Sequence, residues 1–143
     1  MRINDVLRVK GDQVVTVTPD TDVEQLLTVL AEHKIGAVVV SREGSTVEGI
    51  VSERDVVRAL ASRGASVLGE PVTAIHTAEV HTIAPDAAIA DVERLMTERR
   101  FRHVPVVVNG ALHGIVSIGD VVKSRIEQLE TDREQLESYI AQG

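Results

Sequence analysis

Residues 49–57 read GIVSERDVV and residues 114–122 read GIVSIGDVV, so one nine-residue pattern occurs twice in the chain. Each copy begins with a glycine and an apolar pair, which is typical of a strand end, and closes with an apolar pair that suits a helix. The pattern therefore predicts a strand that leads directly into a helix, with a serine at the junction and an aspartate three residues later.

This junction is chemically suited to a sugar phosphate. Backbone N–H groups at the start of a helix point outward and carry partial positive charge, which favours a phosphate. The carboxylates of Asp55 and Asp120 would lie beside those groups, where each can accept hydrogen bonds from the vicinal hydroxyls of a ribose. An alternative stays open, because Ser-x-x-Asp is also a variant of the capping box that closes a helix end.

The repetition extends along most of the chain. Pro19-Asp20 recurs 66 residues later as Pro85-Asp86, and the glycines of the nine-residue pattern are 65 residues apart. Apolar runs and turn residues give each copy the order β-α-β-β-α. Strands are expected over 14–17, 37–40, 47–51, 80–83, 104–108 and 112–116. Helices are expected over 23–30, 55–61 and 89–96 and from near Gly119 onward. Before the first of these helices, Thr21 and Glu24 match a capping box.

A unit of about 50 residues with one open sheet face buries too little apolar surface to be stable alone. We therefore expect an α+β fold in which two repeats pack sheet to sheet about a pseudo-twofold axis. The expected division is 1–66 for the first repeat with its N-terminal segment, 67–126 for the second repeat and 127–143 for a helical extension.

The last helix should reach about Tyr139. Apolar residues follow one side of it at alternating spacings of four and three, with Arg133 as a polar interruption: Val122, Ile126, Leu129, Arg133, Leu136 and Ile140. This heptad-like spacing is typical of a helix that pairs with another helix. A solvated amphipathic tail is the alternative.

Composition excludes several classes of protein. The 143 residues include no cysteine, which removes thiol catalysis, thiolate metal sites and disulfides and is compatible with a reducing cytoplasm, where we expect this chain. No apolar run approaches the length of a membrane span. The net charge of −7 and an aromatic content of 1% argue against nucleic-acid binding. The five histidines lack metal-ligand spacing, and we see no phosphate-binding glycine loop, nucleophile elbow or acid–base pair, so we expect no enzyme.

Taken together, the repeated motifs resemble the tandem CBS-domain pair, or Bateman module, from Ile3 to about Arg125. The resemblance depends on Pro19-Asp20, Ile35-Gly36-Ala37 and residues 49–55, with their counterparts Pro85-Asp86, residues 101–105 and residues 114–120. It is closest to small stand-alone bacterial CBS-pair proteins. Two positions depart from the family pattern: Val39 stands where proline is common, and His76 stands where methionine is common.

The resemblance implies a regulatory module with no required cofactor. Such pairs bind AMP, ADP, ATP or, in some members, NAD or S-adenosylmethionine in two clefts between the repeats, and they commonly form homodimers that act on a client protein, here unknown. One cleft would use Ser117, Asp120 and Ile115, closed by Ile35, Gly36, Ala37 and His103, with the segment around Lys10, Gly11 and Gln13. The other would use Ser52, Arg54, Asp55 and Ile50, closed by Phe101, Arg102 and His103, with Thr77 and Val80 nearby.

We expect the Ser117/Asp120 cleft to be the better site, because the small residues opposite it leave room for a base. Two other functions remain open. The chain could be a structural dimerisation or scaffold protein with vestigial clefts, in which the C-terminal helix makes the association. A weaker alternative is a protein or nucleic-acid partner on the basic surface at 99–103.

Overall fold

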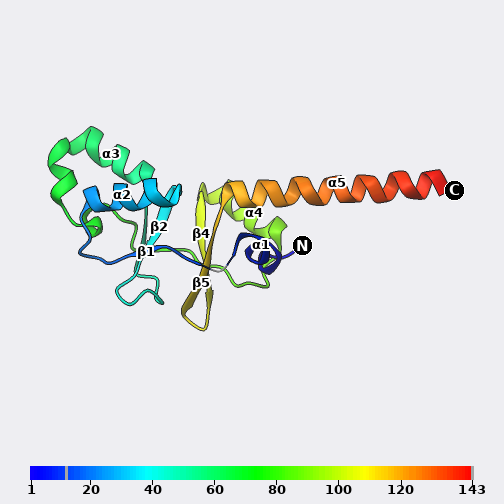
Figure 1. Ribbon diagram of the computed structural model, residues 1–143, viewed down its shortest axis with the longest axis horizontal. Helices are drawn as coiled ribbons and strands as arrows, with labels where there is room; N and C mark the ends of the chain where they lie inside the picture. The colour runs from blue at the N-terminus through cyan, green and yellow to red at the C-terminus, as the bar shows by residue number, and fades with distance from the viewer. Residues whose placement is uncertain (12, 143) are drawn as a thin grey trace.

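The computed structural model describes residues 1–11 and 13–142, which form two small sheets with helices around them (Figure 1). The first sheet has the order β1-β2-β3, with β1 parallel to β2 and β2 antiparallel to β3; the second is an antiparallel pair, β4-β5. The strands are β1 (Thr16–Val17), β2 (Ala37–Val40), β3 (Gly49–Ser52), β4 (His103–Val108) and β5 (Ala111–Ser117). The helices are α1 (Ile3–Lys10), α2 (Val23–His33), α3 (Glu53–Arg63), α4 (Ile89–Arg99) and α5 (Ile118–Gln142), with short 3₁₀ turns η1 (Ala65–Gly69) and η2 (Val72–Ala74) between the halves.

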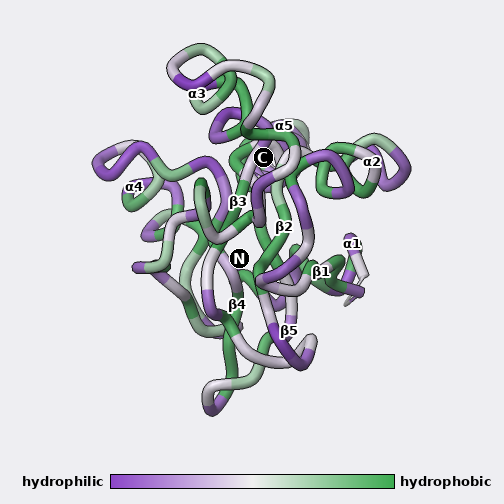
Figure 2. The backbone as a smooth tube through the Cα atoms, turned by 90° about the vertical axis from the view of Figure 1, so that its left-hand side faces the viewer, coloured by the Kyte–Doolittle hydropathy of each residue, from purple (hydrophilic) through white to green (hydrophobic). Residues whose placement is uncertain are grey.

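The first half of the chain forms one apolar core between its sheet and helices α2 and α3. All four residues of β2 are buried, as expected for a strand that is covered on both faces. Figure 2 shows β2, β3 and β4 as mainly hydrophobic segments, with α2 and α4 alternating in hydropathy at the periphery. The core residues are Val17, Val23, Leu26, Leu30, Val38, Val40, Val51, Val56 and Val72.

Helix α2 begins at Val23, as the sequence indicated, but its N-cap lies one residue later than expected. The expected capping box of Thr21 and Glu24 is wrong: Asp22 is the N-cap, and its Oδ1 accepts a 2.7 Å hydrogen bond from the backbone N–H of Gln25. Gln25 reaches back to the N–H of Asp22 at 3.4 Å. Thr21/Glu24 and Asp22/Gln25 have the same spacing, so the sequence alone could not show which pair caps the helix.

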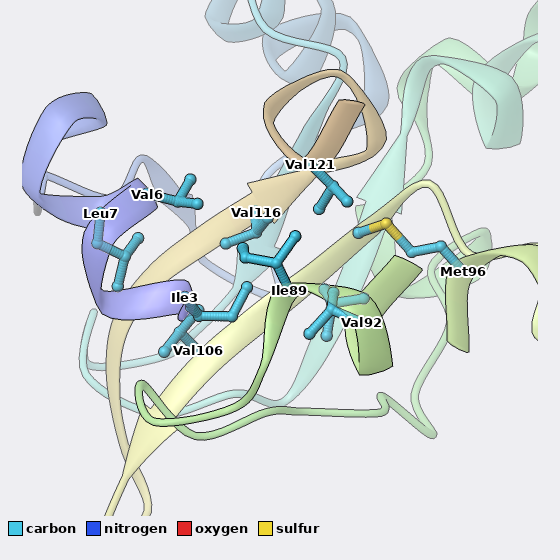
Figure 3. Close-up of a cluster of buried hydrophobic side chains, with 10 residues drawn as sticks. Ile3, Val6, Leu7, Ile89, Val92, Met96, Val106, Val116 and Val121 are labelled. Atoms are coloured by element: carbon cyan, nitrogen blue, oxygen red, sulfur yellow. The ribbon is translucent and has the colours of Figure 1, made fainter. Parts of the chain in front are cut away.

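The second core contains residues from both ends of the chain. Ile3, Val6 and Leu7 of α1 pack against β5, α4 and α5 (Figure 3). The remaining members are Ile89, Val92, Met96, Val104, Val106, Val116 and Val121. The N-terminal helix, which precedes the first repeat in sequence, therefore packs on the second repeat.

The linker between the halves makes the reciprocal contact. Its residues His76 and Thr77 cross the start of β3, where Thr77 and Ile50 exchange backbone hydrogen bonds of 3.0 and 2.9 Å. Backbone hydrogen bonds join the same linker to the start of α2, and others join α1 to the residues before α4. Each repeat is thus completed by the segment that precedes the other repeat.

Both crossings depend on a glycine in the repeated pattern. A Cβ on Gly49 would lie 2.7 Å from His76 Cε1 and 3.0 Å from the carbonyl oxygen of Thr77. A Cβ on Gly114 would lie 2.7 Å from Leu7 Cδ2. Carbon atoms cannot approach so closely. At Gly49 the backbone of the crossing segment limits any adjustment, whereas at Gly114 the Leu7 side chain would have to move.

One predicted strand is not formed. Residues 80–83 were expected to pair as a strand, but only Ile83 bridges Val106, through hydrogen bonds of 3.0 Å to the Pro105 carbonyl and 2.9 Å from the Val107 N–H. Pro105 tolerates this position because its carbonyl, and not the N–H it lacks, takes part in the bridge.

The long C-terminal helix is confirmed. Helix α5 contains 25 residues and projects well past the body of the molecule (Figure 1). Within the described residues, no helix has both the length and the apolar character needed to cross a bilayer.

Replacing Gly49 with alanine should destabilise the fold. The added methyl group meets the linker backbone, which cannot rotate away, and overpacking of this kind costs about 1–3 kcal/mol. Urea unfolding would measure the loss. Gly69→Ala is the matched control, because a Cβ there meets no atom within 4 Å. Equal stability of the two variants would contradict the crossing.

Candidate functional site

A cavity of about 450 Å³ lies between the two halves of the molecule, at the N-terminal end of α3. It is bounded by the ends of β2 and β3, the linker after Thr77 and the segment between α4 and β4. The lining residues are Gly36, Ala37, Ile50, Ser52, Glu53, Arg54, Asp55, Arg58, Thr77, Glu79, Val80, His81, Arg99, Arg100, Phe101, Arg102 and His103. Its volume falls in the range of small-molecule sites.

Ser52 and Asp55 form one wall of the cavity, and they also cap α3. Asp55 Oδ2 accepts a 2.8 Å hydrogen bond from the Ser52 N–H, and the Asp55 N–H donates to Ser52 Oγ at 3.3 Å. Ser52 Oγ also donates to Asp55 Oδ2 at 3.1 Å. The capping function is therefore real. It uses Oδ2, so Asp55 Oδ1 can still accept from a ligand hydroxyl.

The cavity has a basic rim. Five exposed arginines line it: Arg54, Arg58, Arg99, Arg100 and Arg102. The salt bridges found among the described residues involve other cations, so no carboxylate in that part of the chain lies within 4.0 Å of these guanidinium groups. In a protein with a net charge of −7, this concentration of positive charge favours an anionic ligand.

The equivalent couple at α5 has a different environment. The Ser117 N–H donates to Asp120 Oδ2 at 2.9 Å, as in the first copy. Lys10 Nζ also binds Asp120 Oδ2, at 2.7 Å, and donates to the Ile115 carbonyl at 2.8 Å. Burial raises the pKa of Asp120, but the hydrogen bonds from Lys10 and Ser117 outweigh it and hold the pKa below its usual value. The carboxylate predicted to bind ribose is thus already paired with a cation from α1.

His103 lies between the two junctions. It lines the cavity beside Gly36, where a Cβ would lie in ordinary contact with His103 Cε1 at 3.6 Å. Burial lowers the pKa of His103, and the nearby charge of Lys10 lowers it further, against the opposing effect of Asp120. Together, burial and Lys10 favour the neutral form of the His103 ring.

The remaining predicted residues are distributed as follows. Ile35 lines a separate hollow beside α2, together with Gly36 and Glu53. Gln13 is exposed and lies outside the cavity. Gly36 and Ala37, which we assigned to the Ser117/Asp120 cleft, line the Ser52/Asp55 cavity because Ala37 pairs directly with Ser52 across β2 and β3.

Sequence reasoning missed several lining residues: Glu53, Arg58, Glu79, His81, Arg99 and Arg100. Arg58 falls one helical turn after Arg54, so its position on the same face of α3 could have been inferred. The basic run at residues 99–103 was visible, but only the fold shows that it faces the cavity. Among the described residues, no group of three or more acidic or histidine side chains is arranged to hold a metal ion.

Comparison with known proteins agrees with this architecture. A solved structure of a CBS-domain-containing protein from Agrobacterium tumefaciens, ATU1752, is 45% identical, covers 87% of this chain and 99% of its own, and superposes with a TM-score of 0.84. The mitochondrial CBS-domain protein CBSX3 of Arabidopsis thaliana is 32% identical over 99% of this chain and 72% of its own length.

A third relative carries a ligand. The CBS-domain protein PAE2072 from Pyrobaculum aerophilum, solved in complex with AMP, is 28% identical, covers 84% of this chain and 89% of its own, and has a TM-score of 0.74. The sequence profile of the CBS domain matches this chain twice, over residues 5–62 and 72–127. The chain therefore belongs to the CBS-domain family and carries the domain in two copies.

Proposed function

We propose that this protein is a regulatory module that binds a phosphate-bearing adenosine ligand in the cavity beside Ser52 and Asp55. The observation that carries the proposal is the 450 Å³ cavity itself, with a helix start and a carboxylate in its wall and five arginines around it. The AMP complex of PAE2072 supports the same class of ligand. No catalytic role is proposed.

The lining residues suit the parts of such a ligand. Asp55 would accept hydrogen bonds from the ribose hydroxyls, while Ser52 and Arg54 would hold the phosphate at the start of α3. Val80 and Phe101 supply apolar surface for a base.

The charge of the rim favours phosphates. AMP, ADP, ATP and NAD are anions, whereas S-adenosylmethionine carries a positive sulfonium group that five arginines would repel. We therefore rank the adenine nucleotides and NAD above S-adenosylmethionine as ligands of this cavity. The proposed set of ligands is therefore narrower than the set that the family resemblance implied.

The cleft at Ser117 and Asp120 is proposed as a second and weaker site. The sequence favoured this cleft because small residues were expected opposite it. The geometry favours the other cleft, because the Lys10 ammonium neutralises the Asp120 carboxylate through Oδ2 and binds the Ile115 carbonyl, and because Gly36 and Ala37 face the Ser52 side. We also propose a homodimer in the cytoplasm, acting on a client protein that the sequence and the fold leave unnamed.

A structural scaffold is the second candidate function. Both Ser-x-x-Asp couples are satisfied as helix caps without any ligand, and this observation favours it. The two candidates differ in what an adenine nucleotide does to the folded state, since only a true ligand stabilises it by mass action.

AMP should raise the melting temperature of the wild-type protein by several degrees, because a ligand at 100 times its dissociation constant adds about 2.7 kcal/mol of stability. Asp55→Ala should abolish most of this shift. Asp120→Ala is the matched control: it removes the equivalent cap on α5 and should retain the shift. If no adenine nucleotide or NAD stabilises the wild type at millimolar concentration, the scaffold function is the better one.

Replacing Arg99 and Arg100 with glutamine should weaken nucleotide binding, by about tenfold at low ionic strength, and should reduce its dependence on salt. Calorimetric titration in low and high salt would measure both effects. Arg94→Gln on the same helix is the control, because Arg94 does not line the cavity. Unchanged affinity in the double variant would show that the basic rim does not contact the ligand.

Replacing Lys10 with methionine should release Asp120 and open the second cleft. Calorimetry should then detect a second binding event per chain, where the wild type shows one strong event. Arg8→Met, on the exposed side of the same helix, should leave the stoichiometry unchanged. Two strong events in the wild type would contradict the blocking role of Lys10.

A further inference from the structure

Helix α5 is supported by the rest of the molecule only in its first half. Val121 and Ser124 are buried against the body, and Arg125 Nε lies 3.0 Å from Glu93 Oε2 on α4. After Gln128, every described side chain of the helix is exposed. This free part contains about 14 residues, and isolated helices of about 12–15 residues are marginal in water.

The free part nevertheless carries large apolar side chains on one side. Leu129, Leu136 and Ile140 are 57%, 61% and 67% exposed. They continue the line of Val122 and Ile126, which are also exposed, so the apolar stripe runs from the base of α5 to its tip. We call this line the seam: Val122, Ile126, Leu129, Arg133, Leu136 and Ile140.

The base of the seam is hollowed. A groove of about 560 Å³ lies along the first turns of α5 and is lined by Ile118, Gly119, Val122, Lys123, Ile126 and Glu127. Gly119 leaves space in its floor because it has no side chain. The apolar part of this lining suits branched apolar side chains, and the seam ends in two of them, Leu136 and Ile140.

We propose that the seam pairs with the seam of a second copy of this chain in antiparallel orientation, so that the tip of each α5 fills the groove at the base of the other. In this register Val122 meets the partner's Ile140, and Ile126 meets the partner's Leu136. Leu129 meets the partner's Arg133. Every seam residue then has a counterpart, and the two molecular bodies lie at opposite ends of a helical rod about 30 Å long.

Arg133 selects the antiparallel orientation. In a parallel pair it would face its own copy inside the seam, and Asp132 would lie beside the partner's Glu137. In the antiparallel pair Arg133 faces the partner's Leu129 and lies beside the partner's Glu130. Arg133 is free to change partner, because its present bond to Glu137 Oε1 is a 3.0 Å contact between two exposed side chains.

The flanking charges at the two ends of the rod agree with this register. Lys123, at the edge of the groove, comes beside the partner's Glu137, which gives an opposite-charge pair at each end of the rod. The two Glu130 side chains meet near the centre, and so do the two Asp132 side chains; an Arg133 from each chain lies beside them. The pairing does not depend on nucleotide binding, so its success or failure is separate from that of the proposed function.

Disulfide trapping tests the orientation directly, because the chain has no native cysteine. Full-length Val122→Cys and Ile140→Cys chains, mixed and mildly oxidised, should form a mixed disulfide dimer at least about tenfold faster than Leu129→Cys forms a dimer with itself. Faster self-crosslinking of Leu129→Cys would establish a parallel pair and overturn the proposal. Absence of crosslinking in both experiments would overturn it as well.

A second pair of variants tests the seam itself. Leu136→Asp, added to both cysteine chains, should reduce the mixed crosslinking at least about tenfold, because it places a charge in an apolar layer. Gln135→Asp adds the same charge on the outer side of the helix and should change the rate by less than about twofold. Equal rates in the two variants would show that the seam is not the contact. Circular dichroism of each variant confirms that the body is folded.

Discussion

The structure depends on two places where a second segment of the chain crosses a strand at a glycine, in the space that a side chain would otherwise fill. At Gly49 the segment is the linker that leads into the second repeat, and at Gly114 it is the helix that precedes the first. Neither repeat has a complete core without the segment that belongs, in sequence, to the other. The cavity exists because of this exchange: the linker that crosses Gly49 continues past Thr77 and forms one of its walls.

The same exchange makes the two junctions unequal. The two crossing segments occupy equivalent places in the duplication, but their side chains differ. One segment carries Lys10 and the other carries His76. Lys10 is long enough to reach across to Asp120, so that junction is neutralised from within the molecule. At the first junction the equivalent carboxylate remains available, and the surrounding charge comes from arginines that face the cavity. Two nearly identical motifs therefore have different chemistry, because only one of them binds a cation from 110 positions away.

Much of this architecture could be predicted from the sequence, and the failures have definite causes. The duplication gave the two sheets, the order of elements and the junctions, and the heptad-like spacing gave the long last helix. The side of the molecule on which α1 packs was not predictable, since chain order does not say which repeat a preceding segment completes. The residues before Ile83 have the apolar and polar composition of a strand, but only Ile83 reaches the edge of β4. The contact of Lys10 with Asp120 joins residues 110 positions apart and leaves no local signal.

The exchanged segments also constrain how the chain can acquire its structure during synthesis. The linker can pair with β3 and cross Gly49 only after Thr77 has left the ribosome. Helix α1 has no surface to pack on until β5 and the first turns of α5 have appeared. The residues of α1 are therefore synthesised first but are among the last to pack in the folded structure. Contacts of such long sequence separation slow the folding of small domains, so the nascent chain is expected to stay incomplete until nearly its full length has emerged.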